Sequence, residues 1–408
     1  MAEYNEPVNA LSPEVHTFQS GPSDPRLAQC LEQFPSAVFS ERLYQSIELI
    51  ERYSVELAVD LSQQLHLPDQ LDQWRSADEI SQRLSFQPSF KCALAWILER
   101  LVETGCAEAR GNGESRSYRL QHPLWVPDLK TLRAIGVSID TGNAATLDLL
   151  DHVAVLYPAA ARNYQSGDGN LLGPQGVPLW LKYFHNDNLT YAVNNWVGAT
   201  LAADRLSSRR TLRILEIGAG TGSASEILIE SLAERGLLSR VQRYLITEPN
   251  AYFRRCAQRN LTTKYPALPL EWAALDVDLP WQSQGVNAAE FDLVYGVNVM
   301  HISKNLIFSL GEARSTLATD GWLVLGECVR PYDNQPIYPE FMFQILNSFT
   351  NVQTDPEFRS NPGFLTAEQW RRAFSRAGFA HAGVEPDIER IREIYPHFFT
   401  GAICGQSR

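Results

Sequence analysis

ILEIGAGTG, residues 214–222, is an apolar run that passes directly into a turn containing Gly218, Gly220 and Gly222. The residues that follow, SASEILIESLAERG, have the apolar spacing of a helix. Glycine adopts the positive φ values of tight turns and lets a ligand approach the backbone. The spacing is GxGxG, and Ser223 stands where the dinucleotide pattern GxGxxG has its third small residue. A strand, a glycine turn and a helix in this order predict a ligand site at the end of a parallel strand.

Residues 206–408 alternate apolar strands with helical segments around this turn. The predicted strands are RILEIG, RYLITE, LEWAALD, FDLVYGVNV and WLVLGEC, with a final pair near HAGVEP and FFTGAICG. The predicted helices are SASEILIESLAERG, AYFRRCAQRNLTTKY, LIFSLGEARSTLATDG and TAEQWRRAFSRAG. Near-continuous apolar strands separated by helices are typical of a parallel sheet covered on both faces. We therefore predict an α/β fold whose doubly wound, Rossmann-like sheet occupies residues 206–408.

Acidic residues stand at three successive strand ends. Glu216 lies just before the glycine turn, Glu248 ends the next predicted strand, and Asp276 ends the one after it. A carboxylate in the position of Glu248 suits the two hydroxyls of a ribose, and Asp276 suits an adenine amino group. Because three acids would repel a pyrophosphate, they favour a nucleoside ligand without phosphate.

Together LEIGAGTGS, YLITEPNAYF, ALDVDLP, FDLVYGVNVMHISKNL and TDGWLVLGE resemble the motifs of class I S-adenosylmethionine-dependent methyltransferases. They most resemble the C-methyltransferase domains of polyketide synthases, over about residues 165–330 and again in LTAEQWRRAFSRAGF. The resemblance implies a mostly parallel sheet with an antiparallel last strand, S-adenosyl-L-methionine as cofactor and S-adenosyl-L-homocysteine as product. The cofactor-binding residues that it implies are Glu216, Gly218, Gly220, Gly222, Glu248, Phe253, Asp276, Val277 and Asn298.

His301 ends the fourth predicted strand and Glu327 ends the fifth, so a parallel sheet brings both side chains over the crevice beside the glycine turn. Histidine is the natural general base at neutral pH, and a carboxylate behind it holds its tautomer. The pair also matches the family's His–Glu dyad. We therefore predict a methyltransferase of natural-product metabolism in which His301, supported by Glu327, deprotonates a carbon alpha to a carbonyl.

Two other reactions stay open for the same site. His301 does not decide between C-methylation and O-methylation of a phenol, enol or carboxylate, because either acceptor loses a proton to a base. A cyclase that binds the cofactor without transferring methyl is the third alternative. The acceptor is expected to be a small molecule or a thioester that arrives free, on coenzyme A or on a carrier protein.

The N-terminal part has a different organisation. Residues 1–38 are polar and proline-rich, which predicts a loosely structured arm with one short helix. Residues 39–125 follow a winged-helix pattern of helix, turn, helix and hairpin, with Ser76 as an N-cap and the hairpin turn at 111–113. The helix that would enter a DNA groove is mostly apolar, so packing or dimerisation is favoured over DNA binding. This layout resembles small-molecule O-methyltransferases that dimerise through the same region, which implies a homodimer.

Residues 126–205 are predicted to be helical, and residues 180–196 are rich in aromatic side chains and asparagine. This segment is either plain core or a lid over a small-molecule pocket, because such pockets combine aromatic walls with a few polar groups. In the family an insertion after the fifth strand roofs the acceptor site, and here that segment, residues 336–363, lacks the usual tryptophan-rich run. The candidate acceptor contacts are Tyr183, Tyr191, Asn195 and Phe341.

Composition restricts the partners and the compartment. The 408 residues are 44% apolar and 20% charged, with a net charge of −12, which disfavours nucleic acid and anionic membranes as partners. No apolar run is long enough to span a membrane and no signal peptide is recognisable, so we expect a cytoplasmic protein. Six scattered cysteines and eight histidines without metal-ligand spacing predict no metal site. No carrier-protein or ketosynthase sequence accompanies the motifs, which predicts a freestanding enzyme.

Overall fold

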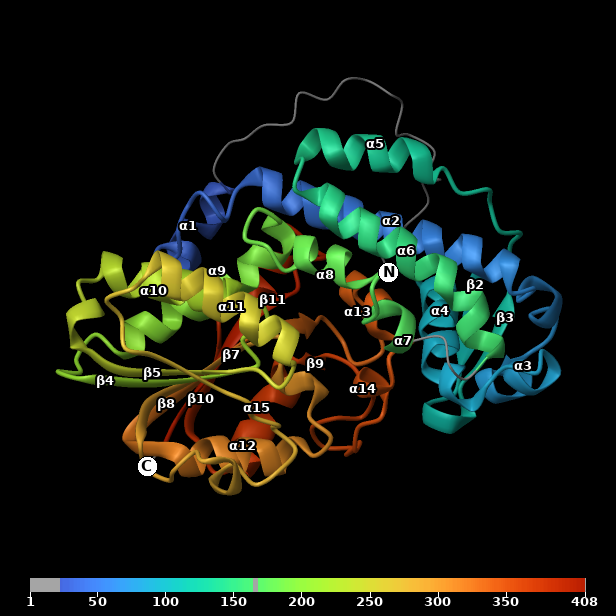
Figure 1. The fold of residues 1–408 in the computed structure, drawn as a ribbon. Coiled ribbons are helices and arrows are strands. Elements are labelled where there is room, and N and C mark those ends of the chain that lie inside the picture. Colours follow the sequence, from blue (N-terminus) through green and yellow to red (C-terminus); the bar gives the residue numbers. More distant parts are fainter. Residues whose placement is uncertain (1–22, 164–167, 408) are drawn as a thin grey trace.

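The computed structural model describes residues 23–163 and 168–407, in which a helical N-terminal part packs against a twisted sheet (Figure 1). Within these residues the main sheet has eight strands, seven in the order β10-β11-β8-β7-β4-β5-β6 and β9 beside β8. Its strands are β4 Leu212–Ile217, β5 Val241–Thr247, β6 Leu270–Ala273, β7 Phe291–Val297, β8 Leu317–Arg330, β9 Leu365–Thr366, β10 Ala380–Glu385 and β11 Thr400–Gln406.

The order of the strands reverses between β4 and β7. β4 is parallel to both of its neighbours, β5 and β7, and β7 is parallel to β8. β11 is antiparallel to β8 and to β10. The predicted doubly wound sheet with its antiparallel strand is therefore confirmed. The glycine turn follows β4 at the reversal point, which is where sheets of this kind bind their ligands.

Helices cover both faces of the sheet. In Figure 1, α9, α10 and α11 lie on one face, and α12 and α15 lie on the other. The helices that follow β4 are α10 Ser223–Glu234, α11 Ala251–Lys264, α12 Leu306–Thr316, α13 Tyr338–Phe343, α14 Asn347–Thr350, α15 Ala367–Arg376 and α16 Ile388–Arg392.

The predicted helix over residues 306–321 is wrong at its end. The carbonyls of Ser315 and Thr316 accept hydrogen bonds from the N–H groups of Ala289 and Glu290, which approach from the strand side. Leu317 then pairs with Phe291 and begins β8. Sheet pairing with β7 therefore ends the helix five residues earlier than its apolar spacing indicated.

The N-terminal part consists of helices and one small sheet. The helices are α1 Ala28–Leu31, α2 Glu41–Gln64, α3 Ala77–Arg83, α4 Lys91–Glu103, α5 Leu129–Ile139, α6 Asn143–Arg162, α7 Asp168–Leu171, α8 Val177–Tyr183 and α9 Leu189–Arg205. The small sheet has the order β1-β3-β2 and is formed by β1 Arg75–Ser76, β2 Ala107–Arg110 and β3 Ser117–Leu120. None of the helices in residues 23–163 and 168–407 combines the length and the hydropathy that a membrane span requires.

Two local predictions in this part are confirmed. Ser76 caps α3 by accepting a hydrogen bond from the N–H of Glu79 at 3.2 Å. β2 and β3 form the predicted antiparallel hairpin. The winged-helix interpretation, the division at residues 38, 125 and 205, and dimerisation remain predictions. The predicted N-terminal arm is described only from residue 23, where it contains the short helix α1, and residues 1–22 lie outside the described part.

A buried ion pair connects the N-terminal helices to the segment beyond β8. Arg100 on α4 is fully buried and bonds to the carboxylates of Glu51 on α2 and Glu103. The second oxygen of Glu51 accepts the N–H of Tyr338, the first residue of α13, at 2.9 Å. Burial raises the pKa of Glu51, and the Arg100 charge opposes that shift. Because α13 lines part of the cavity described below, this connection matters to the site.

We expect Glu51→Gln to lower the free energy of unfolding by about 3 kcal/mol, because it leaves part of a buried guanidinium charge uncompensated. Urea unfolding measures the loss. The double variant Glu51→Gln/Arg100→Met serves as the control, since it removes both charges and should lose less than the two single variants together. Additive losses would show that the pair does not act as a unit.

Candidate active site

Residues 299–303, here named the histidine turn, follow β7 and carry His301. The turn contains the short 3-10 helix Met300–Ile302. Asn298, just before it, has a φ of 50°, and its N–H donates to the carbonyl of Gly326 on β8 at 2.7 Å. This bond continues the β7–β8 pairing and directs the chain back over the end of β8. The histidine turn therefore lies directly beside Glu327.

Glu327 holds both the side chain and the backbone of this turn. His301 Nδ1 lies 2.7 Å from Glu327 Oε2. Glu327 Oε1 accepts the N–H groups of Met300 at 2.9 Å and Val299 at 3.2 Å. Glu327 is fully buried and His301 is 3% exposed. The structure thus brings together the two predicted residues, although neither ends its strand: His301 follows the end of β7 by four residues, and Glu327 lies inside β8, which runs to Arg330. The geometry leaves Nε2 as the free ring nitrogen of His301.

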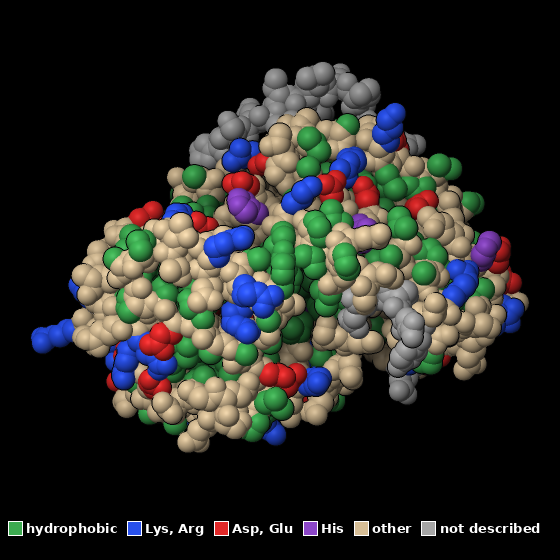
Figure 2. All heavy atoms as spheres, viewed as in Figure 1, with side chains coloured by type: hydrophobic (Ala, Val, Ile, Leu, Met, Phe, Trp, Pro, Cys, Tyr) green, Lys and Arg blue, Asp and Glu red, His purple; other side chains and the backbone are tan. Residues whose placement is uncertain are grey.

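His301 lines an apolar cavity of about 200 Å³. Its walls come from α8, α9, α11, α13 and the segments around β7 and β8, and are mostly aromatic. The lining residues are Leu172, Trp180, Tyr183, Phe184, Tyr191, Phe253, Asn298, His301, Ile302, Cys328, Pro339, Phe343, Leu346, Ser348, Phe349 and Phe364. On the face in Figure 2, hydrophobic side chains gather in a central hollow next to α11, which carries Arg254, Arg255 and Arg259. An apolar chamber with a few polar groups is typical of a small-molecule site.

The glycines of the turn after β4 have different surroundings. All three have positive φ, 62° at Gly218, 55° at Gly220 and 88° at Gly222. A Cβ at Gly218 would lie 2.4 Å from a methyl of Val299, and a Cβ at Gly222 would press on α11. A Cβ at Gly220 would meet nothing within 4 Å. Gly218 and Gly222 are therefore needed for packing, whereas Gly220 leaves open space above the backbone.

The predicted ribose and adenine acids follow β5 and β6, the two strands on one side of β4. Glu248 is mostly buried, and its carboxylate accepts the N–H groups of Gly220 at 2.9 Å and Asn250 at 2.7 Å. Burial raises the pKa of Glu248, and the two backbone donors oppose that shift. Asp276 is exposed and follows β6 by three residues, since β6 ends at Ala273 and not at Asp276 as predicted. Val277 comes next and is partly buried.

Glu216 lies deeper than the other acids. It is 1% exposed, one carboxylate oxygen accepts from the hydroxyl of Tyr244 on β5, and the other has no hydrogen-bond partner. Burial raises the pKa of Glu216 to about 7, although the hydrogen bond from Tyr244 lowers it. The structure therefore places Glu216 inside β4, buried in the core of the sheet just before the glycine turn.

Of the four candidate acceptor contacts, two lie at the cavity. Tyr183 and Tyr191 line it. Asn195 is buried and donates to Asn186 Oδ1 at 2.8 Å, and it is absent from the lining. Phe341 is also absent, because its ring stacks on Tyr157 at 4.7 Å on the far side of α13. Phe343 takes the place expected for Phe341.

Several wall residues lie outside the four predicted acceptor contacts. Phe364 packs 4.3 Å from the His301 ring, centroid to centroid, and Phe349 lies 5.8 Å away. Both come from the segment after β8, whose fold depends on contacts far along the chain. Cys328 also lines the cavity, and burial raises the pKa of its thiol well above the usual value. A protonated thiol is a poor nucleophile, so Cys328 serves as part of the wall.

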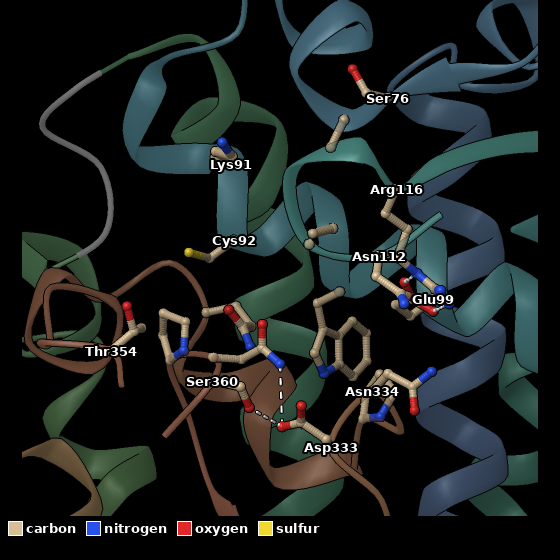
Figure 3. Close-up of a pocket in the computed structure, with 18 of the residues that line it drawn as sticks. Ser76, Lys91, Cys92, Glu99, Asn112, Arg116, Asp333, Asn334, Thr354 and Ser360 are labelled. Atoms are coloured by element: carbon tan, nitrogen blue, oxygen red, sulfur yellow. Dashed lines mark hydrogen bonds and ion pairs between the residues drawn. The ribbon is translucent and has the colours of Figure 1, made fainter. Parts of the chain in front are cut away.

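A larger cleft of about 810 Å³ lies between the N-terminal part and the segment after β8 (Figure 3). Its cations are neutralised by neighbouring acids, since Lys91 pairs with Asp78 and Arg116 pairs with Glu99. Asp333, labelled in Figure 3, accepts from Ser360. None of the predicted site residues lines this cleft. In residues 23–163 and 168–407, no three or more His, Cys, Asp or Glu side chains are grouped as metal ligands.

Comparison with solved structures identifies the fold. The chain superposes on the CurJ carbon methyltransferase with a TM-score of 0.74, at 22% identity, over 94% of this chain and 96% of that one. The CMeT domain of the citrinin polyketide synthase gives 0.68 at 18% identity, over 95% and 99%. This is the fold of the polyketide carbon methyltransferases. The trans-methyltransferase CalH, solved in complex with SAH, shares this carbon-methyltransferase fold more distantly, with a TM-score of 0.58 at 20% identity over 90% and 92%.

Sequence comparison leads to the same group of proteins. The chain is 34% identical over 183 residues to the highly reducing polyketide synthase ALT1 of Alternaria alternata, a match that covers 43% of this chain. The match covers 6% of ALT1, so the chain spans only a small fraction of the length of such relatives. No protein-family model matches the chain. The resemblance to polyketide synthase carbon methyltransferases that the motifs predicted is thus confirmed in sequence and in fold.

The glycine turn allows packing and ligand binding to be separated. Gly218→Ala should lower the free energy of unfolding by about 2–4 kcal/mol, because its Cβ meets Val299 at a strained φ. Gly220→Ala should cost about 1 kcal/mol but weaken binding of S-adenosylhomocysteine at least about tenfold, since its Cβ enters open space above the turn. Urea unfolding and titration calorimetry give the two numbers. Unchanged ligand affinity in Gly220→Ala would show that no ligand lies over this glycine.

Glu216 predicts a pH dependence of stability. Its pKa rises from 4.5 in the unfolded chain to about 7 in the folded one, so the folded state binds the extra proton. The stabilisation that this proton adds to the free energy of unfolding is complete below about pH 4.5. It is lost as the pH rises through 7, a difference of about 3 kcal/mol. Urea unfolding at pH 5 and pH 8 measures the decline in the free energy of unfolding between these pH values. This decline should be smaller in Glu216→Gln than in wild type. The exposed Glu234→Gln should not change it, and an equal decline in all three proteins would contradict the assignment.

Proposed function

We propose that this chain is an S-adenosylmethionine-dependent methyltransferase of polyketide-type natural-product metabolism that methylates a carbon alpha to a carbonyl. The observation that carries the proposal is the His301–Glu327 pair, 2.7 Å between Nδ1 and Oε2, at the wall of an apolar cavity. The carbon-methyltransferase fold and the similarity to polyketide synthases support it.

The residues around the glycine turn fit the nucleoside of the cofactor. Gly220 leaves open space over the backbone, and the carboxylate of Glu248 lies at the edge of that space. Each oxygen of Glu248 keeps a further lone pair for a ribose hydroxyl. Phe253 at the start of α11 faces the cavity, and Asp276 and Val277 lie beyond the next strand. When bound there, S-adenosylmethionine supplies a methyl group on a positively charged sulfur, an electrophile that needs no further activation.

His301 serves as the base in this proposal. Because Glu327 accepts a hydrogen bond from the Nδ1–H of His301, the neutral imidazole carries its free lone pair on Nε2. That nitrogen removes the acidic proton of the acceptor, and the buried carboxylate stabilises the imidazolium that forms. The mostly apolar walls lower the polarity around the pair, which strengthens this electrostatic stabilisation.

Asn298 supports the oxygen of the acceptor. Its Oδ1 accepts the N–H of Cys328 at 3.1 Å, which fixes the amide with Nδ2 available as a donor. Asn298 lines the cavity next to His301. A donor here stabilises the negative charge that develops on an enolate oxygen when the adjacent carbon loses its proton. This contact favours a carbonyl compound, such as a β-keto thioester free or on a carrier protein, as acceptor.

The test uses S-adenosylmethionine with a carbon-13 methyl group and a panel of β-keto thioesters, 2-oxo acids and phenols, read by NMR. We expect the label on carbon, and a loss of about 10²–10⁴-fold in rate for His301→Ala with unchanged affinity for S-adenosylhomocysteine. His122→Ala, a substitution of an exposed histidine, is the matched control and should keep full activity.

Other outcomes have defined meanings. A methoxy signal would make the protein an O-methyltransferase that uses the same base. Tight cofactor binding without label on any acceptor would contradict methyl transfer to these classes and favour a cyclase. Full activity in His301→Ala would exclude His301 as the base.

A further inference from the structure

Arg359 is a fully buried arginine that binds carbonyls of the histidine turn, whereas Glu327 binds its N–H groups. It belongs to the loop between α14 and β9 and is 0% exposed. Its Nη1 donates to the carbonyl of Ser303 at 2.6 Å, and its Nη2 donates to the carbonyl of His301. The planar guanidinium has the fork geometry needed to hold two acceptors at once. One side chain therefore bonds to the backbone carbonyl of His301 and to that of Ser303, two positions later.

The loop that carries Arg359 is itself fastened. Asp355 and Arg359 exchange both backbone hydrogen bonds, each at 2.8 Å. The N–H of Gln353 donates to the carbonyl of Lys304 at 2.8 Å. Three carbonyls in residues 301–304 are thus bound by one loop, so the position of the turn depends on this loop as well as on β8.

Opposite charges meet the two ends of the histidine turn. Glu327 accepts the N–H groups of Val299 and Met300, and Arg359 donates to the carbonyls of His301 and Ser303. A negative group at the N–H end and a positive group at the carbonyl end both match the dipole of a helical turn. The side chain of His301 itself bonds to Glu327.

Stability alone is a poor explanation for a charge in this place. No carboxylate in the described ranges lies within ion-pair distance of Arg359, and its Nε has no hydrogen-bond partner. Burial lowers the pKa of Arg359 to about 10, and the charges of Asp278 and Glu327 only partly offset this. An apolar side chain of similar size would avoid the desolvation cost of a buried charge. The guanidinium is better explained by its hydrogen bonds to the carbonyls of His301 and Ser303.

We propose that Arg359 is a positioning residue that fixes the histidine turn, and with it the ring of His301, for proton abstraction. The inference rests on the proposed function for its effect on rate, whereas its structural part can be measured separately. Misplacement of a reacting group by about 1 Å can cost about 10²-fold in rate. Loss of Arg359 should therefore reduce turnover without removing any group that touches the acceptor.

The experiment compares Arg359→Met with Arg392→Met in the full chain. Arg392 is the matched control, because its side chain is 7% exposed and also donates to two backbone carbonyls, of Phe398 at 2.8 Å and Val329 at 2.7 Å. Amide hydrogen exchange of a peptide covering residues 299–305 reports the histidine turn. Carbon-13 methyl transfer gives kcat and the KM for S-adenosylmethionine. Arg359→Lys is the conservative variant, which keeps the charge but cannot hold both carbonyls as a rigid fork.

In Arg359→Met we expect exchange in residues 299–305 to become at least about tenfold faster. Turnover should fall about 10²-fold, with KM for the cofactor changed by less than about threefold, and Arg359→Lys should be intermediate. Arg392→Met should leave both readouts near wild type. Wild-type exchange in Arg359→Met, or equal changes in both methionine variants, would overturn the inference. If the wild-type chain transfers no methyl, the proposed function fails, and the exchange result alone decides the positioning role.

Discussion

The carboxylate of Glu327 is the interaction on which the rest of the site depends. This fully buried residue of β8 binds the ring of His301 and the N–H groups of Val299 and Met300 in the histidine turn. It can do so because β8 lies between β7 and β11, with Glu327 paired to Gly401 on one side and the chain leaving β7 on the other. A charge in this location is tolerated only because every hydrogen bond it needs is supplied by neighbours.

The features that the sequence predicted well are local ones. The apolar strands, the glycine turn and the acids at the strand ends are encoded within a few residues of one another. The parallel sheet then fixes which strand ends meet, so His301 and Glu327 could be paired without a structure. The same reasoning placed Glu248 beside the turn, where it binds the N–H of Gly220. It placed Asp276 at the same sheet edge, although β6 ends three residues before it.

The features that escaped prediction depend on irregular segments or on helix phase. Phe341 and Phe343 are two positions apart on α13, which turns their side chains to different sides of the helix. Phe341 consequently packs on Tyr157, and Phe343 faces the cavity. Arg359 lies in a loop without a periodic pattern, and its carbonyl partners are 56 and 58 residues away. No local signal identifies such a contact, because the loop's path is set by tertiary packing.

The attachment of α13 has a consequence for the shape of the proposed acceptor site. The helix presents Phe343 to the cavity, while its opposite side is bound by Glu51 of α2 and by Tyr157 of α6, whose hydroxyl donates to the carbonyl of Phe341 at 2.8 Å. The N-terminal helices thus set the distance between this wall and His301, whereas the proposed cofactor site is built from strand ends. Substitutions in α2 and α6 can therefore enlarge or narrow the chamber while the strand ends around the glycine turn stay unchanged.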